Sequence, residues 1–457
     1  MTATIAEQLA TFTELLDAKA LPEDVRRMAR WCVLDWFGSA LAGAKAKPTA
    51  ILLDVARELG GRPEATLLPD GSKTSAPLAA LVNAGASHVV EMDDVHRQAV
   101  FHPGATVIPA ALAVAEREGA SGADLLGAIV AGYEVGIRLG EAAGQRHYDY
   151  WHTTGTCGTF AAAAAAGKLL GLDSGRLAAA LGSAGTAAAG LWEFLVDGAM
   201  SKQLHPAKAA HDGILSALLA ERGFTAATRI LEGEKGFLRA MAQGGDPARL
   251  TEGLGGGTFR ILGTAFKASA ACYHIHSSID AALLLREKHR PDPKSIRSVT
   301  VRLYGAAHRL LEPVEPTTPY AAKFSVPYCV ATALLHGGAG PDAFTDARLK
   351  EKAVQTLLGK VRLVHDPALD AAYPEQWPAI VELETAAGTD TIRVDIPRGD
   401  PKNPMSEMDL LAKFNALAGD LPLEDRRRLA ETCLALDEKT ENVAATLEGL
   451  IFSASGL

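Results

Sequence analysis

Alanine and glycine are concentrated in residues 158–195, GTFAAAAAAGKLLGLDSGRLAAALGSAGTAAAGLWEFL, and this density constrains the fold more than any other feature. Alanine has the highest helix propensity, so the stretch predicts helices. Small side chains also allow helix axes to approach closely. The sequence leaves open whether propensity or close packing explains the alanines. In both cases the first two thirds of the chain is predicted to be packed helices.

Flanking segments extend the helical pattern. In residues 23–44 apolar side chains recur at helical spacing and form one stripe. Residues 105–143 predict two more helices, separated by a Gly-Ala-Ser-Gly turn in which Ser121 is placed to cap the second. These segments predict core helices.

The pattern changes after about residue 290. Apolar and polar residues alternate in four runs, at 295–305, 360–366, 379–388 and 389–399, and these predict strands. Helices are predicted between the first two runs, at 321–337 and 346–361, and another begins after the capping residue Ser406. The predicted fold class is therefore mainly α. An all-helical domain is built from both chain ends, residues 1–265 and 403–457, and a smaller α+β lid domain comprises residues 266–402.

Length and composition agree with two domains and limit the partners. A chain of 457 residues exceeds what one core usually organises. A formal net charge of -9 argues against a nucleic-acid partner. The chain has no leader-like start and no run of about 18 apolar residues, so we expect a soluble cytoplasmic protein without a membrane partner. Five scattered cysteines without a C-x-x-C pair predict reduced thiols.

The segment EMDDVHRQAVFHPG, residues 91–104, has the densest set of chemically useful side chains. Acids, imidazoles and a guanidinium gather in it: Glu91, Asp93, Asp94, His96, Arg97 and His102. Such a combination is typical of acid–base chemistry. Asp93 and Asp94 are also suited to capping a helix or holding the loop, and Glu91, Asp94 and His96 are interpreted as loop structure.

Cationic and polar side chains also stand at three predicted helix starts. Lys202 and His205 lie in the lead-in to one helix, and His152 precedes another. The third start carries Lys267, Cys272, His274 and His276. Helix N-termini, ammonium groups and imidazolium all favour anions, so the set predicts a substrate with several carboxylates. Taken singly, each histidine is more often a cap or a surface residue, and Lys208 and His211 are expected to face solvent.

Cofactor motifs are missing from the sequence. No H-x-x-x-H, H-E-x-x-H or cysteine-rich spacing predicts a metal site, and neither G-x-S-x-G nor a phosphate-binding loop is present. The glycine-rich stretch at 253–257 has no strand before it and no Lys-Ser or Lys-Thr after it, so it is interpreted as a connector. We therefore predict catalysis without a metal or cofactor.

Five segments in order resemble the MmgE/PrpD family. They are residues 91–116, 200–225, 266–282, 322–334 and 399–406. The family includes 2-methylcitrate dehydratase, cis-aconitate decarboxylase and iminodisuccinate epimerase. The resemblance implies a helical domain with a smaller α+β lid, a homodimer, a small polycarboxylate substrate and chemistry at a carbon next to a carboxylate.

The resemblance also implies a site between the two domains, with matching positions in both. These positions are Asp93, Arg97, His102, His152, Lys202, Lys267 and Tyr328, with Cys272 and His276 beside them. Arg97 stands where the decarboxylase branch has a hydroxyl residue, and Cys272 stands where that branch has a histidine. Both departures argue against decarboxylation of cis-aconitate.

Roles follow from the chemistry of such a substrate. Removing a proton next to a carboxylate creates enediolate charge, which needs a base and nearby cations. His102 or His152 is the predicted base, because imidazole titrates near neutral pH. Asp93 would orient a catalytic histidine or accept a hydrogen bond from a substrate hydroxyl. Cationic side chains, namely Arg97, Lys202 and Lys267, would hold carboxylates, and Lys267 is also counted with the catalytic group.

Tyr328 would donate a hydrogen bond, with Cys272 and His276 as further substrate contacts. The leading hypothesis is a lyase that dehydrates a 2-methylcitrate-like or citrate-like hydroxy acid. An epimerase or isomerase of a dicarboxylate is the alternative. A protein that binds polycarboxylates without turning them over is the third.

Overall fold

The computed structural model describes residues 3–311 and 315–451. It divides into two compact units. The first, here called the helical unit, runs to Thr264 and resumes at Ser406. The second, here called the mixed unit, spans Ala265–Met405. The mainly α fold with a smaller α/β region is confirmed.

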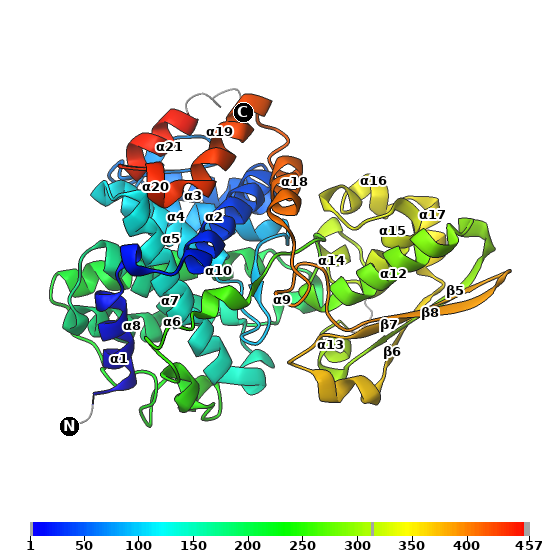
Figure 1. Cartoon of the computed structure of the whole chain (residues 1–457), viewed down its shortest axis with the longest axis horizontal. Helices are drawn as coiled ribbons and strands as arrows, with labels where there is room; N and C mark the ends of the chain where they lie inside the picture. The colour runs from blue at the N-terminus through cyan, green and yellow to red at the C-terminus, as the bar shows by residue number, and fades with distance from the viewer. Residues whose placement is uncertain (1–2, 312–314, 452–457) are drawn as a thin grey trace. The chain divides into compact units, whose positions relative to one another are not determined.

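Fifteen α-helices of the described residues belong to the helical unit (Figure 1). They are α1 (Ile5–Leu15), α2 (Glu23–Gly43), α3 (Lys47–Leu59), α4 (Ala76–Val89), α5 (Gly104–Glu118), α6 (Gly122–Tyr148), α7 (Thr153–Leu169), α8 (Ser174–Ala187), α9 (Phe194–Asp197), α10 (Ser201–Glu221), α11 (Phe237–Met241), α18 (Glu407–Leu417), α19 (Leu423–Leu434), α20 (Leu436–Lys439) and α21 (Val443–Ile451). Short strands β1 (Ala65–Thr66) and β2 (Lys73–Thr74) pair antiparallel, and β3 (Val95–His96) precedes α5. The predicted cap of α6 is confirmed, because Ser121 and Asp124 form a reciprocal capping box.

Helix α7 is the centre of the helical unit. Residues 153–167 of this helix are all buried, and α5, α6, α8 and α10 pack around it. A Cβ atom added to Gly213 of α10 would lie 2.5 Å from Cβ of Ala162, and one added to Gly132 of α6 would lie 2.9 Å from the carbonyl oxygen of Ala161. Close packing is therefore a reason for the small residues in this stretch, beyond helix propensity.

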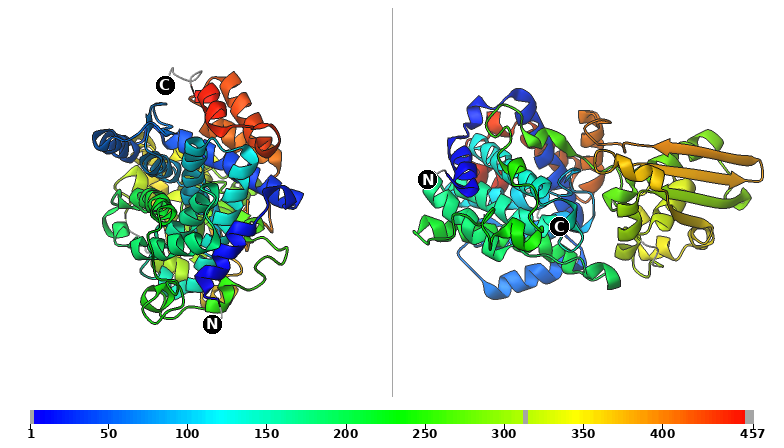
Figure 2. Two further views of the ribbon diagram at one scale, coloured as in Figure 1. Left: turned by 90° about the vertical axis from the view of Figure 1, so that its left-hand side faces the viewer. Right: turned by 90° about the horizontal axis from the view of Figure 1, so that it is seen from below.

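The C-terminal helices pack onto the N-terminal part of the chain. In Figures 1 and 2, α18 to α21 lie in the same body as the blue α2, and contacts join α18 and α19 to α2. Two ion pairs with little solvent exposure reinforce this packing, between Arg30 and Asp437 and between Lys413 and Asp35, each at 2.5 Å. Ser406 caps α18 as predicted.

The mixed unit contains a four-stranded sheet in the order β6-β5-β7-β8. Its strands are β5 (Ile296–Leu303), β6 (Val361–His365), β7 (Ala379–Thr385) and β8 (Gly388–Val394), which confirms the four predicted strands. β5 is parallel to β6 and antiparallel to β7, which pairs antiparallel with β8. Helices α12 (His276–His289) and α15 (Val326–His336) pack on the sheet, α12 against β7 and β8 and α15 against β6.

The remaining helices of the mixed unit are short. They are α13 (Gly305–Leu310), α14 (Pro319–Ala322), α16 (Asp346–Leu349) and α17 (Lys352–Leu358). One helix was predicted over 346–361, and this was wrong, because Glu351 is extended and divides the segment into α16 and α17. The five cysteines are buried free thiols. Within the part of the chain that the structure describes, no helix has the length and apolar character needed to cross a bilayer.

Candidate active site

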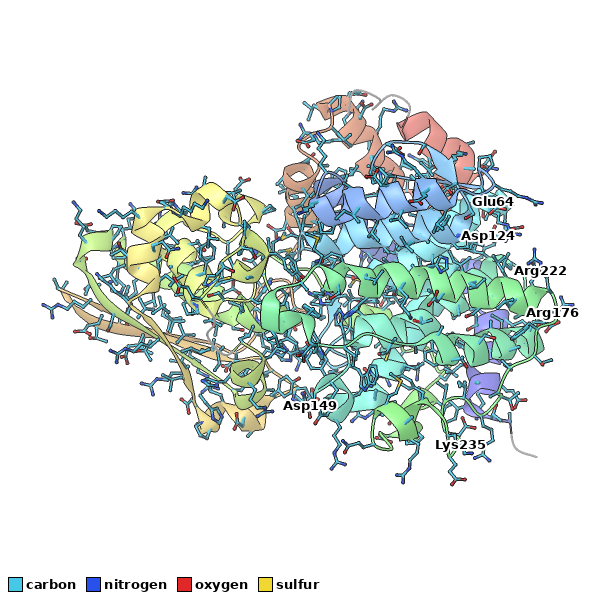
Figure 3. The ribbon with its side chains drawn as sticks, turned by 180° about the vertical axis from the view of Figure 1, so that it is seen from behind. Glu64, Asp124, Asp149, Arg176, Arg222 and Lys235 are labelled. Carbon is cyan, nitrogen blue, oxygen red and sulfur yellow. The ribbon has the colours of Figure 1, made fainter. Side chains whose placement is uncertain are left out.

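The loop between α4 and α5 carries the acid-rich segment, and it is buried. Glu91 and Asp93 are 0% and 1% exposed. Glu91 and Val100 have positive φ angles of 57° and 45°, which side chains other than glycine rarely adopt. By contrast, Figure 3 shows charged side chains such as Asp124 and Arg222 on the outside of the helical unit. Strained backbone and buried acids in one loop are typical of functional sites.

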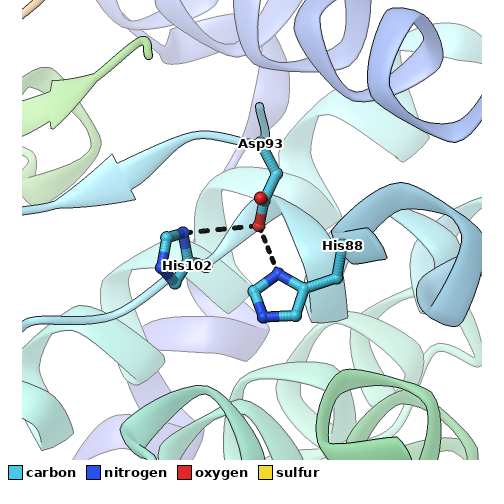
Figure 4. Close-up of side chains that lie close together, drawn as sticks. All are labelled: His88, Asp93 and His102. Atoms are coloured by element: carbon cyan, nitrogen blue, oxygen red, sulfur yellow. Dashed lines mark hydrogen bonds and ion pairs between the residues drawn. The ribbon is translucent and has the colours of Figure 1, made fainter. Parts of the chain in front are cut away.

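Two histidines share the carboxylate of Asp93 (Figure 4). Nδ1 of His88 lies 2.7 Å from Oδ2 of Asp93, and Nδ1 of His102 lies 3.3 Å from the same oxygen. Nδ1 of His102 is also 2.7 Å from the carbonyl oxygen of Asp94. A carboxylate and a carbonyl only accept hydrogen bonds, so both rings carry a proton on Nδ1. When such a ring is neutral, its lone pair is on Nε2, the nitrogen that can act as a base.

Helix α7 fixes the other end of this loop. The hydroxyl of Thr153 donates to the carbonyl oxygen of Val100, and the backbone N–H of His102 donates to the hydroxyl of Thr154 at 3.3 Å. Because both threonines belong to the first turn of the buried α7, the backbone of His102 is held by the rigid centre of the unit.

The same three side chains are the one group in the described parts of the chain that could hold a metal ion. One ligand atom each from His88, Asp93 and His102 lies within 4.8 Å of the others. Two imidazoles and a carboxylate suit zinc or ferrous iron. A metal on Nδ1 of His102 would, however, displace the proton that this atom donates to the carbonyl of Asp94. The hydrogen bonds therefore fit a carboxylate-held base better than a metal centre.

His152 lies next to this group at the start of α7. Its ring centroid is 5.7 Å from that of His88 and 6.4 Å from that of His102. Its Nδ1 is 3.0 Å from Nδ1 of His205, which comes from α10. Burial lowers the pKa of His152 well below its ordinary value, and burial together with nearby positive groups lowers the pKa of His205 to about 3. Both rings are therefore neutral near neutral pH.

Lys202 forms a buried ion pair with Glu91. The prediction that Lys202 and His205 lie in a lead-in was wrong, because α10 begins at Ser201 and both residues are helical. The interpretation of Glu91 as loop structure missed its partner, since the loop and α10 are distant in sequence. Glu91 offsets the charge that Lys202 would otherwise present to a carboxylate substrate.

Asp94 and His96 have structural contacts. The carboxylate of Asp94 accepts from the N–H of Gly104 at 2.9 Å and from the hydroxyl of Tyr133 at 2.6 Å, so Asp94 holds the start of α5. Burial raises the pKa of Asp94 to about 7. Burial and the nearby guanidinium groups of Arg260 and Arg97 lower the pKa of His96 to about 3. Arg97 itself is 8% exposed and lies on the same loop.

Four further predicted site residues belong to the mixed unit. Lys267 is fully buried, and Cys272 lies just before the short 3-10 helix Tyr273–Ile275. Nε2 of His276 is 3.2 Å from the carbonyl oxygen of Ala271. Tyr328 is fully buried and its hydroxyl donates to the carbonyl oxygen of Ala343, while burial raises its pKa to about 12.

The nine predicted site residues thus divide by unit. Those of the helical unit are Asp93, Arg97, His102, His152 and Lys202. Those of the mixed unit are Lys267, Cys272, His276 and Tyr328. Within the helical unit Asp93, His102 and His152 converge on one cluster, whereas Arg97 and Lys202 lie on the elements that flank it.

Sequence reasoning missed His88, the hydrogen bond between His205 and His152, and Lys413. His88 could have been predicted from the sequence, because it is an imidazole only five residues before Asp93. No local sequence pattern marked Lys413 as part of the site. From the C-terminal α18 its ammonium donates to the carbonyl oxygen of Met92 at 2.7 Å, while pairing with Asp35, and so holds the loop that carries Asp93.

A carboxylate-held imidazole beside a pair of neutral imidazoles is an arrangement suited to acid–base chemistry. Residues 7–250 match the MmgE/PrpD N-terminal domain and residues 269–437 match the MmgE/PrpD C-terminal domain. The chain belongs to the MmgE/PrpD family. The match to the C-terminal domain extends beyond the mixed unit into α18 and α19.

The curated relatives include two different kinds of enzyme. The chain is 28% identical to cis-aconitate decarboxylase of Aspergillus terreus, over 96% of this chain and 94% of the fungal protein. It is 27% identical to cis-aconitate decarboxylase of Homo sapiens, over 92% of this chain and 89% of the human protein. It is also 27% identical to 2-methylcitrate dehydratase of Escherichia coli K12, over 39% of this chain and 40% of that protein.

Proposed function

We propose that this protein is a lyase that removes water from a small hydroxy polycarboxylate of the citrate or 2-methylcitrate kind. The observation that carries the proposal is the tautomer of His102. Because Nδ1 faces the carboxylate of Asp93 and the carbonyl of Asp94, the lone pair is on Nε2. A reaction that begins with removal of a proton next to a carboxylate needs such a base.

The proposed reaction uses one proton carrier. Nε2 of His102 takes the proton from the carbon next to the carboxylate, and the C–H electron pair moves into the enediolate. The carboxylate of Asp93 stabilises the imidazolium that results. The electron pair then forms the double bond as the C–O bond breaks, and His102 returns its proton to the leaving hydroxyl. The products are water and an unsaturated acid, and His102 is restored.

His152 has a different proposed role. Its lowered pKa keeps the ring neutral, and a neutral imidazole can donate a hydrogen bond to a substrate oxygen that gains charge. Arg97, Lys202 and Lys267 are the proposed contacts of the substrate carboxylates, because cationic side chains favour negative charge. Cys272 and His276 remain proposed contacts. Tyr328 is the weakest of the proposed contacts, since its proton goes to Ala343.

Decarboxylation is the second candidate, and the length of the similarity favours it. The cis-aconitate decarboxylases match along almost the whole chain, whereas the dehydratase match covers 39% of it. Loss of carbon dioxide, however, removes no proton and needs one delivered to the carbanion that forms, so it would use His102 as an acid and not as a base. Arg97 and Cys272 also depart from the decarboxylase pattern.

The test is incubation of the purified protein with 2-methylcitrate, citrate and cis-aconitate in deuterium oxide. Dehydration is expected to give an unsaturated product with ultraviolet absorbance and no carbon dioxide. Carbon dioxide from cis-aconitate would replace the proposal with decarboxylation. Deuterium in recovered substrate without an unsaturated product would indicate an epimerase or isomerase. No turnover of any of the three acids would indicate a protein that binds them without converting them.

A matched pair of variants tests the base. His102→Gln is expected to lower kcat by at least about 10²-fold, the usual scale of a general base. His211→Gln is the control, since His211 lies in α10 and contacts Asp212 instead of the cluster. Dialysis against a chelator is expected to leave turnover unchanged. Loss of turnover that a divalent metal restores would instead assign His88, Asp93 and His102 to a metal.

The oligomeric state and compartment remain predictions. We expect a cytoplasmic homodimer, as in the family, and light scattering of the purified protein would measure its mass.

A further inference from the structure

We propose that His205 is a positioning residue for His152: it donates a hydrogen bond from its Nδ1 to Nδ1 of His152 and so holds the proton of His152 on Nε2. This inference rests on the proposed function, because it explains how His152 can donate to a substrate oxygen. It concerns one proton and one hydrogen bond, and no bond of the protein breaks.

The geometry requires that the two rings differ in tautomer. Nδ1 of His152 and Nδ1 of His205 are 3.0 Å apart, which is hydrogen-bond distance. Burial keeps both rings neutral, since the pKa of each is lowered. A neutral imidazole has one N–H, so one Nδ1 must donate and the other must accept. The accepting ring then has its own proton on Nε2.

One observation and one consequence of the proposed function favour His205 as the donor. His152 is 1% exposed, whereas His205 is 8% exposed and can expose its bare Nε2 to water at lower cost. In the opposite arrangement the bare Nε2 would belong to His152, and its lone pair would face the substrate's carboxylate or hydroxyl oxygen. An anionic oxygen at that point therefore selects the form in which Nε2 of His152 carries the proton.

The groups around His152 explain why the position of its proton matters. The positive or titratable groups that face it are His205, Lys202, His88 and His102, and each of them opposes its protonation. His88 and His102 both carry their proton on Nδ1, towards Asp93, and so present lone pairs on Nε2. Within this cluster of imidazoles, His152 is the ring that can be a neutral donor, and only through its bond to His205.

Packing holds the two rings in register. The backbone N–H of His152 donates to the carbonyl oxygen of Gly190 at 2.9 Å, and the ring lies 4.7 Å from the ring of Trp192. A Cβ atom on Gly190 would lie 3.4 Å from Nδ1 of His205, and the φ of Gly190 is 149°. The segment before α9 therefore packs on both rings, and His205 is also fixed by the rigid α10.

A pair of isosteric variants tests the direction of the hydrogen bond. His205→Asn places an amide that can donate to Nδ1 of His152, whereas His205→Asp has the same shape but a carboxylate that only accepts. We expect His205→Asn to retain turnover within about 10-fold and His205→Asp to lose at least about 10²-fold in kcat, the scale for removing one transition-state donor. Equal kcat in the two variants would overturn the inference, because a merely structural role does not distinguish donor from acceptor.

The tautomer can also be read without turnover. Solid-state ¹⁵N NMR of the histidine-labelled full chain, with tricarballylate as an unreactive tricarboxylate, distinguishes protonated from bare ring nitrogens. His152→Gln identifies the signals. We expect a bare Nδ1 and a protonated Nε2 for His152, and the reverse for the His205→Asp variant. A protonated Nδ1 in the unmodified chain would overturn the inference. The expected tautomer in a chain that dehydrates no acid would refute only the proposed function.

Discussion

Replacement of Asp93 by asparagine tests the central contact of the site. The substitution keeps the shape of the side chain and removes its charge. Oδ2 of Asp93 lies 3.3 Å from Nδ1 of His102, and at this separation opposite unit charges attract by about 5 kcal/mol at an effective dielectric constant of about 20. Both charges are delocalised and an amide oxygen still accepts a hydrogen bond, so we expect about 3 kcal/mol to be lost from the transition state. This corresponds to a loss in kcat of about 10²-fold.

The carbonyl oxygen of Asp94 limits the loss. At 2.7 Å it keeps accepting from Nδ1 of His102, so the tautomer of the ring survives in Asp93→Asn. Where the acid alone sets the tautomer, the same change costs about 10⁴-fold in kcat. The prediction is therefore a loss clearly below that figure.

Steady-state kinetics with the confirmed substrate, combined with thermal unfolding, measures the effect. Asp149→Asn is the control, because Asp149 is an exposed carboxylate of the same unit (Figure 3) and should leave kcat unchanged. A kcat for Asp93→Asn within about 3-fold of the unmodified chain would refute the assignment of His102 as a base stabilised by Asp93. A loss of about 10⁴-fold would refute the role given to the carbonyl of Asp94.

Three further changes test the surroundings of the site. Glu91→Gln removes the carboxylate that pairs with the buried ammonium of Lys202 and should lower the free energy of unfolding by about 3–5 kcal/mol. The double variant Glu91→Gln/Lys202→Met should recover most of this loss. A loss below about 1 kcal/mol in urea titrations would contradict a buried ion pair. The pKa of Asp94 is raised from 3.8 to about 7, so its contribution to stability is fully present below about pH 4 and is lost as the pH rises through 7. Relative to Asp94→Asn, the unmodified chain should lose up to about 4 kcal/mol in free energy of unfolding between pH 4 and 8. Parallel curves of unfolding free energy against pH for the two proteins would disprove this. Gly213→Ala should lower the free energy of unfolding by about 1–3 kcal/mol, because the new Cβ would lie 2.5 Å from Cβ of Ala162. At the exposed Gly175 the same change should leave the free energy of unfolding unchanged. Equal melting temperatures for the two variants would contradict the close packing of α7 and α10.

Local patterns predicted the elements well. The alternation in residues 379–388 predicted β7, because one face of the sheet is buried and the other is not. Ser121 and Ser406 marked helix starts, because the capping hydrogen bond forms within four residues. The helix predicted over 346–361 failed, since Glu351 is extended and nothing in the periodicity marked it.

The candidate site was only partly predictable. Asp93 and His102 are nine residues apart, and their density with other polar groups singled them out. His88 lies in the last turn of α4, before the acid-rich segment 91–104, and no pattern of its own marked it. Pairing between Glu91 and Lys202 joins positions 111 residues apart, and no local pattern encodes such a contact.

The sequence by itself determined the class of fold, the helical and mixed character of the two regions, and the residue types available for acid–base chemistry, because propensity, periodicity and capping act over a few residues. Tertiary structure alone decided which nitrogen of each imidazole carries a proton. That choice depends on the hydrogen-bond partner of each ring: the carboxylate of Asp93 accepts from His88, the carbonyl of Asp94 accepts from His102, and in our proposal the ring of His205 donates to His152. Hydrogen bonds act over about 3 Å, and only packing places their partners at that distance.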